Sequence, residues 1–185
     1  MTDYPDNKRK NGPRIQKVPN GDDRPRLICP DCDYIAYENP KIVVGTVCSY
    51  KNRILLCKRA IEPRTGYWTM PAGYMELEET TQEGARREAY EEAGIDVTLG
   101  PLLAMYNLPH INQVQIFYKG TLDTDHLAPG HETQEAAFFH WDEIPWENLA
   151  FPTVKLALLK FEKTKEQTHF VPDQKVIQTH KLSAL

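Results

Sequence analysis

The sequence lacks an apolar run of the length that crosses a bilayer, about 20 consecutive residues. Residues 1–26 are polar and rich in charged residues and proline, so they have no apolar core of the kind found in a secretory signal. Cysteine is scarce, and of the four present only Cys29 and Cys32 have the spacing of a motif. From these absences we expect a protein of the reducing cytoplasm that has no membrane partner.

The chain also lacks an excess of positive charge, since its formal net charge is −4. Proteins that bind the nucleic-acid backbone usually carry a basic field, so we expect no nucleic-acid partner. An acidic protein that binds an acidic substrate must recruit cations, and a divalent metal ion is the usual means. Hydrophobic residues make up 41% of the 185 residues, which is enough for one globular domain with small additions.

The apolar pattern predicts several strands and a helix near the end of the chain. Residues 42–50 and 53–57 are rich in β-branched and apolar residues and are separated by Lys51-Asn52, which indicates a hairpin. The remaining expectations are a loop at 66–73, strands near 101–107, 113–122 and 136–141, and an amphipathic helix at about 153–164. The polar segment beyond residue 165 is expected to be only partly ordered.

The clearest helix is predicted for residues 79–93. Thr80 and Glu83 have the spacing of a capping box at its start, and Gly94 suits the left-handed position that ends a helix. Small residues recur at every fourth position and form a narrow stripe that favours close packing against a sheet: Ala85, Ala89 and Ala93.

Three glutamates share another face of this predicted helix. Their spacings of three and four residues bring their side chains together, and like charges so placed destabilise a bare helix. A hard divalent cation such as Mg²⁺ binds carboxylate oxygens and removes that repulsion, whereas a solvated charged surface is the common alternative. The surrounding residues decide between these interpretations because their spacing forms a motif: Gly73, Glu79, Arg87-Glu88, Glu91-Glu92 and Gly94.

This motif resembles the box of the Nudix hydrolase family at every fixed position. The resemblance covers about residues 41–162 and includes the segments 66–73 and 141–145 on either side of the box. It implies an α/β fold of the Nudix type, an α/β/α sandwich with a mixed β-sheet. It also implies metal-dependent hydrolysis of a small-molecule nucleotide, a nucleoside diphosphate linked to another group. We expect Mg²⁺ or Mn²⁺ as the cofactor and a homodimer as the assembly.

The same resemblance assigns metal-binding positions. Glu88, Glu91 and Glu92 fall on the positions of the family's metal ligands, and Gly73 offers a backbone carbonyl close to the metal. Metal ions that bridge a pyrophosphate neutralise its charge and activate a bound water, and a nearby carboxylate can take the proton.

Catalytic roles follow from the resemblance as well. Arg87 orients the network of carboxylates, and Glu79 occupies a supporting position. The base varies within the family, so the later loop that holds Glu132 and Glu135 is a second source, although an ordinary exposed loop explains either residue equally well. The expected catalytic set is Glu79, Arg87, Glu91, Glu92 and Glu132.

Residues 1–39 are expected to form a polar arm and a degenerate zinc-ribbon-like hairpin, ahead of a catalytic domain at 40–165 and a tail at 166–185. The segment Cys29-Pro30-Asp31-Cys32 has the spacing of half a zinc ribbon, but structural zinc takes four ligands. The segment resembles the ribbon of a NADH-pyrophosphatase-like branch, in which the first ligand pair would fall near Asn7 and Lys10. Neither binds zinc, so we favour loss of zinc, with ligands from another subunit as the alternative.

Within the family, the chain resembles the plant-type FAD and ADP-ribose pyrophosphatases. The resemblance implies release of AMP from FAD or ADP-ribose, with a narrow preference for FAD. Residues 106–112 differ from the Ser-Gln-Pro-Trp-Pro-Phe segment of NADH pyrophosphatases, which argues against NADH. The alternatives are NADH, an oxidised nucleoside triphosphate, or a catalytically silent nucleotide-binding module, and the intact box favours an enzyme.

Substrate contacts are the least specific of these expectations. Arg64, Tyr74 and Tyr106 are the residues that we expect to bind the substrate, by phosphate contact or by stacking on a ring. Ordinary packing or solvated surface is the alternative for each of them, and for a further group of possible contacts: Arg24, Arg26, Lys58, Tyr67 and Phe151.

Overall fold

The computed structural model of the protein describes residues 12–178, and the chain divides into two compact units, residues 1–39 and residues 40–185. The positions predicted for a first pair of ribbon ligands, Asn7 and Lys10, therefore lie outside the described residues. No helix in the described part of the chain has the length and apolar character needed to span a membrane.

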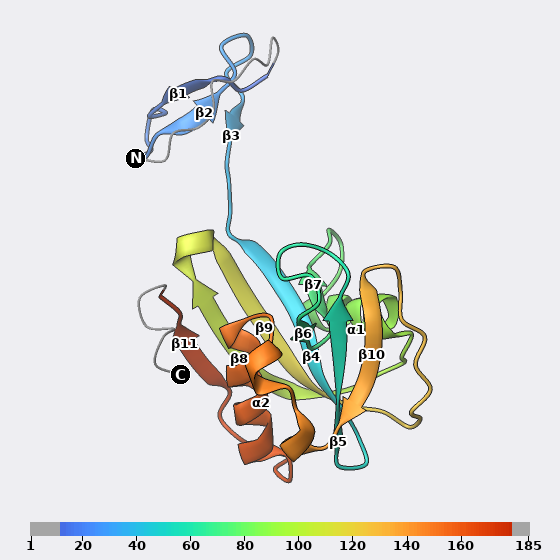
Figure 1. Cartoon of the computed structure of the whole chain (residues 1–185). Coiled ribbons are helices and arrows are strands. Elements are labelled where there is room, and N and C mark those ends of the chain that lie inside the picture. The colour runs from blue at the N-terminus through green and yellow to red at the C-terminus, as the bar shows by residue number, and fades with distance from the viewer. Residues whose placement is uncertain (1–11, 179–185) are drawn as a thin grey trace. The chain divides into compact units, whose positions relative to one another are not determined.

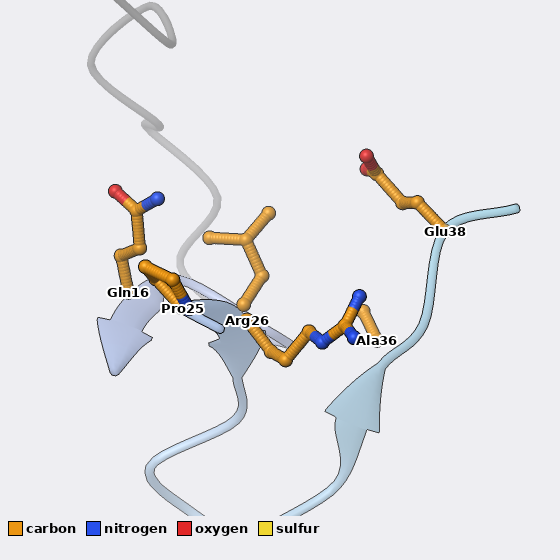
Figure 2. A pocket seen from close by; sticks show the side chains of 6 residues that line it. Gln16, Pro25, Arg26, Ala36 and Glu38 are labelled. Carbon is orange, nitrogen blue, oxygen red and sulfur yellow. The ribbon is translucent and has the colours of Figure 1, made fainter. Parts of the chain in front are cut away.

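The smaller unit contains a three-stranded antiparallel sheet (Figure 1) in the order β1 (Ile15–Lys17), β2 (Arg26–Ile28) and β3 (Ile35–Ala36). The part predicted as a polar arm thus contributes β1, which pairs with β2 along its whole length. A hollow of about 80 Å³ on this sheet is lined by Gln16, Pro25, Arg26, Leu27, Ala36 and Glu38. Figure 2 shows the side chains around it. Ligand pockets usually measure about 300–1,000 Å³, so this hollow is too small for a nucleotide.

The larger unit is built on an eight-stranded sheet (Figure 1) in the order β10-β5-β4-β9-β8-β11, with β6 beside β5 and β7 beside β4. The sheet is mixed, because β4 and β9 are parallel, as are β8 and β11, while the other pairs are antiparallel. The strands are β4 (Lys41–Tyr50), β5 (Arg53–Arg59), β6 (Trp68–Thr69), β7 (Ala72–Tyr74), β8 (Thr98–Leu108), β9 (Gln113–Thr121), β10 (Thr133–Phe139) and β11 (Asp173–Val176).

Two helices cover opposite faces of this sheet, α1 (Thr81–Ala93) and α2 (Pro152–Thr164). Successive strand residues point to opposite faces, and the two hydrophobic cores follow that alternation. Val47 and Leu56 belong to the core under α2, whereas their neighbours Cys48 and Leu55 belong to the core under α1. The α/β/α sandwich with a mixed sheet is therefore confirmed.

Most of the predicted elements are present with shifted ends. The hairpin is confirmed, because β4 and β5 pair antiparallel on either side of Lys51 and Asn52. The segment at 66–73, predicted as a loop, instead contributes the short strands β6 and β7. Three short 3₁₀ helices complete the unit: η1 (Pro109–Ile111), η2 (Trp141–Glu143) and η3 (Trp146–Asn148).

The C-terminal segment contains a strand that the sequence did not predict. Beyond residue 165 the chain forms β11, which pairs parallel with β8, and Ile177 is buried in the core under α2. The Tyr106 hydroxyl donates a hydrogen bond to the Asp173 carboxylate at 3.1 Å, which ties β11 to β8. The polar composition concealed this strand because it is an edge strand whose side chains are largely exposed. The buried contact is made by Ile177, the residue that follows the strand.

Candidate active site

The sequence signals at the two ends of α1 are confirmed. The Thr80 side chain accepts a hydrogen bond from the Glu83 amide at 3.2 Å, and the Glu83 carboxylate accepts one from the Thr80 amide at 2.8 Å. Gly94 has φ 67° and its amide donates to the carbonyl of Tyr90, which ends the helix in the left-handed conformation. The side chains of the alanine stripe are fully buried against the sheet: Ala85, Ala89 and Ala93.

Gly73 lies on β7, which pairs with β4 and packs beside α1. A β-carbon at this position would lie 2.3 Å from Oε2 of Glu88, which is far closer than a van der Waals contact. Glycine is therefore required here because the Glu88 carboxylate lies directly against the backbone. The family resemblance gives Gly73 a part at a metal site, and the structure adds a steric reason for glycine.

Arg87 is the centre of a carboxylate network. Its guanidinium donates twice to Glu79, at 3.0 and 2.8 Å, and once each to Glu88 at 2.7 Å and Glu91 at 3.0 Å. A further bond reaches the carbonyl of Tyr74 at 3.0 Å. Hydrogen bonding to Glu79 is the largest cause of the raised pKa of Arg87, so the residue stays charged. Its five donors thus fix the positions of three carboxylates and the end of β7.

Glu88 and Glu92 are buried, each 8% exposed, which is unusual for a carboxylate. Burial is the main cause that raises the pKa of Glu92 to about 8, even though the Ala72 amide donates to its carboxylate at 3.2 Å. Burial likewise raises the pKa of Glu88, against the opposing effect of Arg87. The site therefore holds negative charge at a free-energy cost, and a bound cation would relieve that cost.

Glu132 lies just before β10, and its backbone carbonyl accepts a hydrogen bond from the amide of Ala60 at 2.8 Å. Its negative charge contributes to the raised pKa of Glu88 and of Glu92, after the larger effect of burial. Glu135 instead pairs with Lys58 at 3.7 Å across the two strands. Of the two loop glutamates, Glu132 is the one whose charge reaches the buried carboxylates.

The carboxylates suit a hard divalent cation by their chemistry, since Mg²⁺ and Mn²⁺ prefer oxygen ligands. Among residues 12–178, however, no three His, Cys, Asp or Glu side chains converge closely enough to hold an ion. Arg87 separates Glu88 from Glu91, and Glu92 is directed to the amide of Ala72. The Glu91 side chain is 56% exposed, so it is free to swing away from the guanidinium toward a cation.

The three predicted substrate-binding residues have different surroundings. Tyr106 is fully buried in the core under α2, so the expectation that it stacks on a substrate ring is wrong. Tyr74 is 48% exposed, with the ammonium of Lys41 4.9 Å from the centre of its ring. Arg64 is exposed, has φ 67°, and lies over the ring of Tyr67 at 5.2 Å. Tyr74 and Arg64 therefore remain available to a ligand.

Arg59 is a residue that the sequence argument missed. It lies at the end of β5, where its positive charge lowers the pKa of Glu92 in opposition to burial. Its Nε donates to the carbonyl of Pro63 at 2.8 Å, and its guanidinium lies 5.3 Å from the centre of the Phe151 ring. Strand alternation gives the signal that was available, because Arg59 follows Leu55 and Cys57 on the α1 face, whereas the proposed phosphate contact Lys58 does not.

Comparison with known proteins agrees with this architecture. Residues 39–159 match the family model described as the NUDIX domain, and residues 12–38 match the zinc-ribbon model described as Nudix N-terminal. A crystal structure of a NUDIX hydrolase from Nitrosomonas europaea is 41% identical to this chain. The similarity covers 88% of this chain and 93% of that protein, with a TM-score of 0.83.

Two curated relatives extend the comparison. The ADP-ribose pyrophosphatase of Methanocaldococcus jannaschii is 31% identical over 129 residues, which cover 66% of this chain and 74% of that protein. A mitochondrial NAD(P)H pyrophosphatase of Mus musculus is 30% identical over 144 residues, which cover 73% of this chain but only 38% of the mouse protein. With its domain match, its carboxylate helix and its sandwich fold, this chain belongs to the Nudix hydrolase family.

Proposed function

We propose that this Nudix pyrophosphatase hydrolyses the pyrophosphate bond of a nucleoside diphosphate derivative, FAD or ADP-ribose, and releases AMP. The observation that carries the proposal is the surplus of carboxylates around a single arginine. Arg87 compensates part of the charge of Glu79, Glu88 and Glu91, while two further glutamates of the site receive no hydrogen bond from it: Glu92 and Glu132. Such a surplus favours a divalent cation, which in turn attracts the phosphates of a nucleotide.

The residues of α1 would hold the cation. Glu88, Glu91 and Glu92 would provide carboxylate oxygens, and the backbone of Gly73 lies against the Glu88 carboxylate. When bound, Mg²⁺ or Mn²⁺ would supply charge neutralisation on the phosphates and activation of water. Arg87, tied to Glu79 by two hydrogen bonds, holds the carboxylates of this face in place.

The proton of the attacking water needs an acceptor. Glu92 is the first candidate, since burial favours its protonated form in the metal-free protein, and a bound cation would bring its pKa back toward that of a free carboxyl. Glu132 is less buried, with 45% of its side chain exposed, and its position beside the box makes it the second acceptor. Glu91 also belongs to the predicted catalytic set. Because Arg87 bonds to it and it is exposed, we assign it chiefly to the cation.

Cationic groups near the carboxylates would bind the phosphates. Arg59 is held by Pro63 and Phe151 next to Glu92, so its guanidinium is positioned before the substrate arrives. Arg64 and Tyr74 lie on exposed segments and would contact the groups on either side of the pyrophosphate.

The choice of an ADP-containing substrate has two supports. The archaeal relative named as an ADP-ribose pyrophosphatase matches this chain over 74% of its own length, and we extend that substrate class to this chain. The chain also has a front unit of about forty residues, which a minimal triphosphate-cleaning domain does not need. FAD and ADP-ribose share the AMP half, so we expect both to be accepted. The archaeal relative moves our preference from FAD to ADP-ribose.

One alternative has a specific observation in its favour. The mouse relative is named as an NAD(P)H pyrophosphatase, and the zinc-ribbon model matches residues 12–38. The deciding experiment is a measurement of kcat/KM for ADP-ribose, FAD, NADH and 8-oxo-dGTP with Mg²⁺, with identification of the products. We expect AMP from ADP-ribose and FAD, at rates that exceed those for NADH and 8-oxo-dGTP by about tenfold or more. A lead for NADH supports the alternative, and a lead for 8-oxo-dGTP contradicts the dinucleotide proposal.

A further inference from the structure

Two thiols lie close together in the turn between β2 and β3, and the proposed hydrolysis uses neither of them. Cys29 is 5% exposed and Cys32 is exposed. The turn is tight, because the Cys29 amide donates to the carbonyl of Tyr34 at 2.8 Å and the Asp33 amide donates back to Cys29 at 2.9 Å. The pair therefore belongs to a hydrogen-bonded turn, in which the side chain of Cys32 contacts that of Cys29.

The described residues of this unit do not fit a structural zinc ion. Zinc takes four ligands, and the two cysteines supply two. Within residues 12–178 no third His, Cys, Asp or Glu joins them in a group that could hold a metal. The carboxylate of Asp31 is engaged by Arg14, which donates to it at 2.7 and 3.1 Å. The ion pair of Arg14 and Asp31 thus connects the chain just before β1 to the cysteine turn. In a zinc ribbon a metal ion makes such a connection.

The Cys29 side chain lies among hydrogen-bonding groups of the turn. A hydrogen bond from the backbone of Asp31 is the largest cause of the lowered pKa of Cys29, and contacts with the side chain and backbone of Cys32 lower that pKa further, whereas burial and the negative charge of Asp31 oppose them. The Cys29 thiol also lies 3.8 Å from the Asp31 carboxylate, to which it donates. The two other cysteines are different, because burial raises the pKa of Cys48 and Cys57, which are 0% and 1% exposed. Cys29 and Cys32 therefore differ from the two core cysteines, whose thiolates are disfavoured by burial.

We propose that Cys29 and Cys32 form a reversible dithiol–disulfide site that reacts with low-molecular-weight disulfides such as glutathione disulfide. Exposed Cys32, as its thiolate, attacks one sulfur of the reagent, which breaks the reagent's S–S bond and releases one thiolate. Cys29, as its thiolate, then attacks the sulfur of Cys32, forms the protein disulfide and releases the second thiolate. Two electrons pass from the protein to the reagent, which is reduced to two thiols.

The test is an equilibrium titration of the full-length protein, after treatment with a chelator, in glutathione buffers of graded redox ratio. Differential alkylation followed by peptide mass mapping reports the state of each cysteine. We expect Cys29 and Cys32 to lose their free thiols together and to appear in one cross-linked peptide. Cys48 and Cys57 serve as internal controls, and we expect them to react at least about tenfold more slowly.

A variant separates the two steps. In Cys29→Ser the resolving thiol is absent, so Cys32 should accumulate as a mixed disulfide with glutathione, which intact mass detects as one added glutathione. Three results would overturn the proposal: both thiols stay alkylatable at every ratio, Cys32 in the variant stays unmodified, or the untreated protein holds one zinc per chain that protects both thiols. None of these readouts depends on the hydrolase activity.

Discussion

Each unit of the chain contains an arginine among potential metal ligands, and the two arrangements differ in their balance of charge. In the front unit, Arg14 pairs with the single carboxylate of Asp31 and the charges cancel. In the Nudix unit, Arg87 contacts three carboxylates and leaves a net negative charge beside buried Glu92. We therefore propose a metal ion for the second arrangement, which a cation would stabilise, and none for the first.

The largest effect is expected for Glu91→Gln. The substitution removes one negative charge from the proposed cation site, so kcat should fall about a thousand-fold or more. The side chain is 56% exposed, so the melting temperature should change little. The matched control is Arg86→Gln on the exposed part of the same helix, which should retain its activity. A Glu91→Gln variant that keeps more than about a tenth of the wild-type rate contradicts the role assigned to Glu91.

The second prediction concerns the close contact at Gly73. A β-carbon in Gly73→Ala would displace the Glu88 carboxylate, and a shift of about 1 Å at a catalytic group costs about 100-fold in rate. Gly100→Ala is the matched control, because a β-carbon there would lie 3.3 Å from that of Lys119 and far fewer groups must move. Equal activity of the two alanine variants would show that Glu88 does not need its position against β7.

The third prediction follows from the pKa of Glu92. In the metal-free protein this pKa is raised from 4.5 to about 8, so the folded state binds the proton more tightly than the unfolded state. The free energy of unfolding should therefore fall as pH rises from about 4.5 to about 8, by at most about 5 kcal/mol. Urea titrations at several pH values test this, and Glu92→Gln should flatten the decline. Identical pH profiles for the variant and the wild type would contradict it.

The smallest effects belong to the front unit. We expect the purified protein to carry well under one zinc per chain, and Cys29→Ser to lower the free energy of unfolding only modestly, by about 1 kcal/mol. Arg14→Gln leaves Asp31 without its partner and should have a comparable small effect, since the pair is partly exposed. Elemental analysis measures the zinc content, and urea titration measures the free energy of unfolding of the two variants. One stoichiometric zinc held by Cys29 and Cys32 would show that the front unit obtains ligands elsewhere.

The sequence predicted those parts of the molecule that depend on local patterns. The ends of α1 followed from Thr80, Glu83 and Gly94, because caps are set by residues a few positions apart. The hairpin followed from two β-rich segments on either side of Lys51 and Asn52, and the sandwich from the family resemblance. The resemblance supplied the glutamates of the box, and the structure adds which of them are buried, because burial depends on β7 and on the loop before β10.

The remaining errors share a physical cause, which is that long-range contacts leave little trace in a local pattern. Tyr106 was expected at the site, yet its strand turns it into the core toward Asp173. The strand β11 was missed because only Ile177, just after it, is deeply buried. Arg59 was missed because its role depends on Glu92, a residue of another element whose pKa is lowered by the positive charge of Arg59. Residues of this kind can be recognised only when the pairing of the strands in the sheet is known.

Direct binding of Mn²⁺ tests, without a substrate, whether the carboxylates of α1 hold a divalent cation. Titration followed by electron paramagnetic resonance would give the stoichiometry and affinity for the wild type, Glu91→Gln and Arg86→Gln. We predict that Glu91→Gln weakens binding by about tenfold or more, since one charged ligand is lost, whereas Arg86→Gln leaves the affinity nearly unchanged. Equal Mn²⁺ affinity in the wild type and Glu91→Gln would contradict the account.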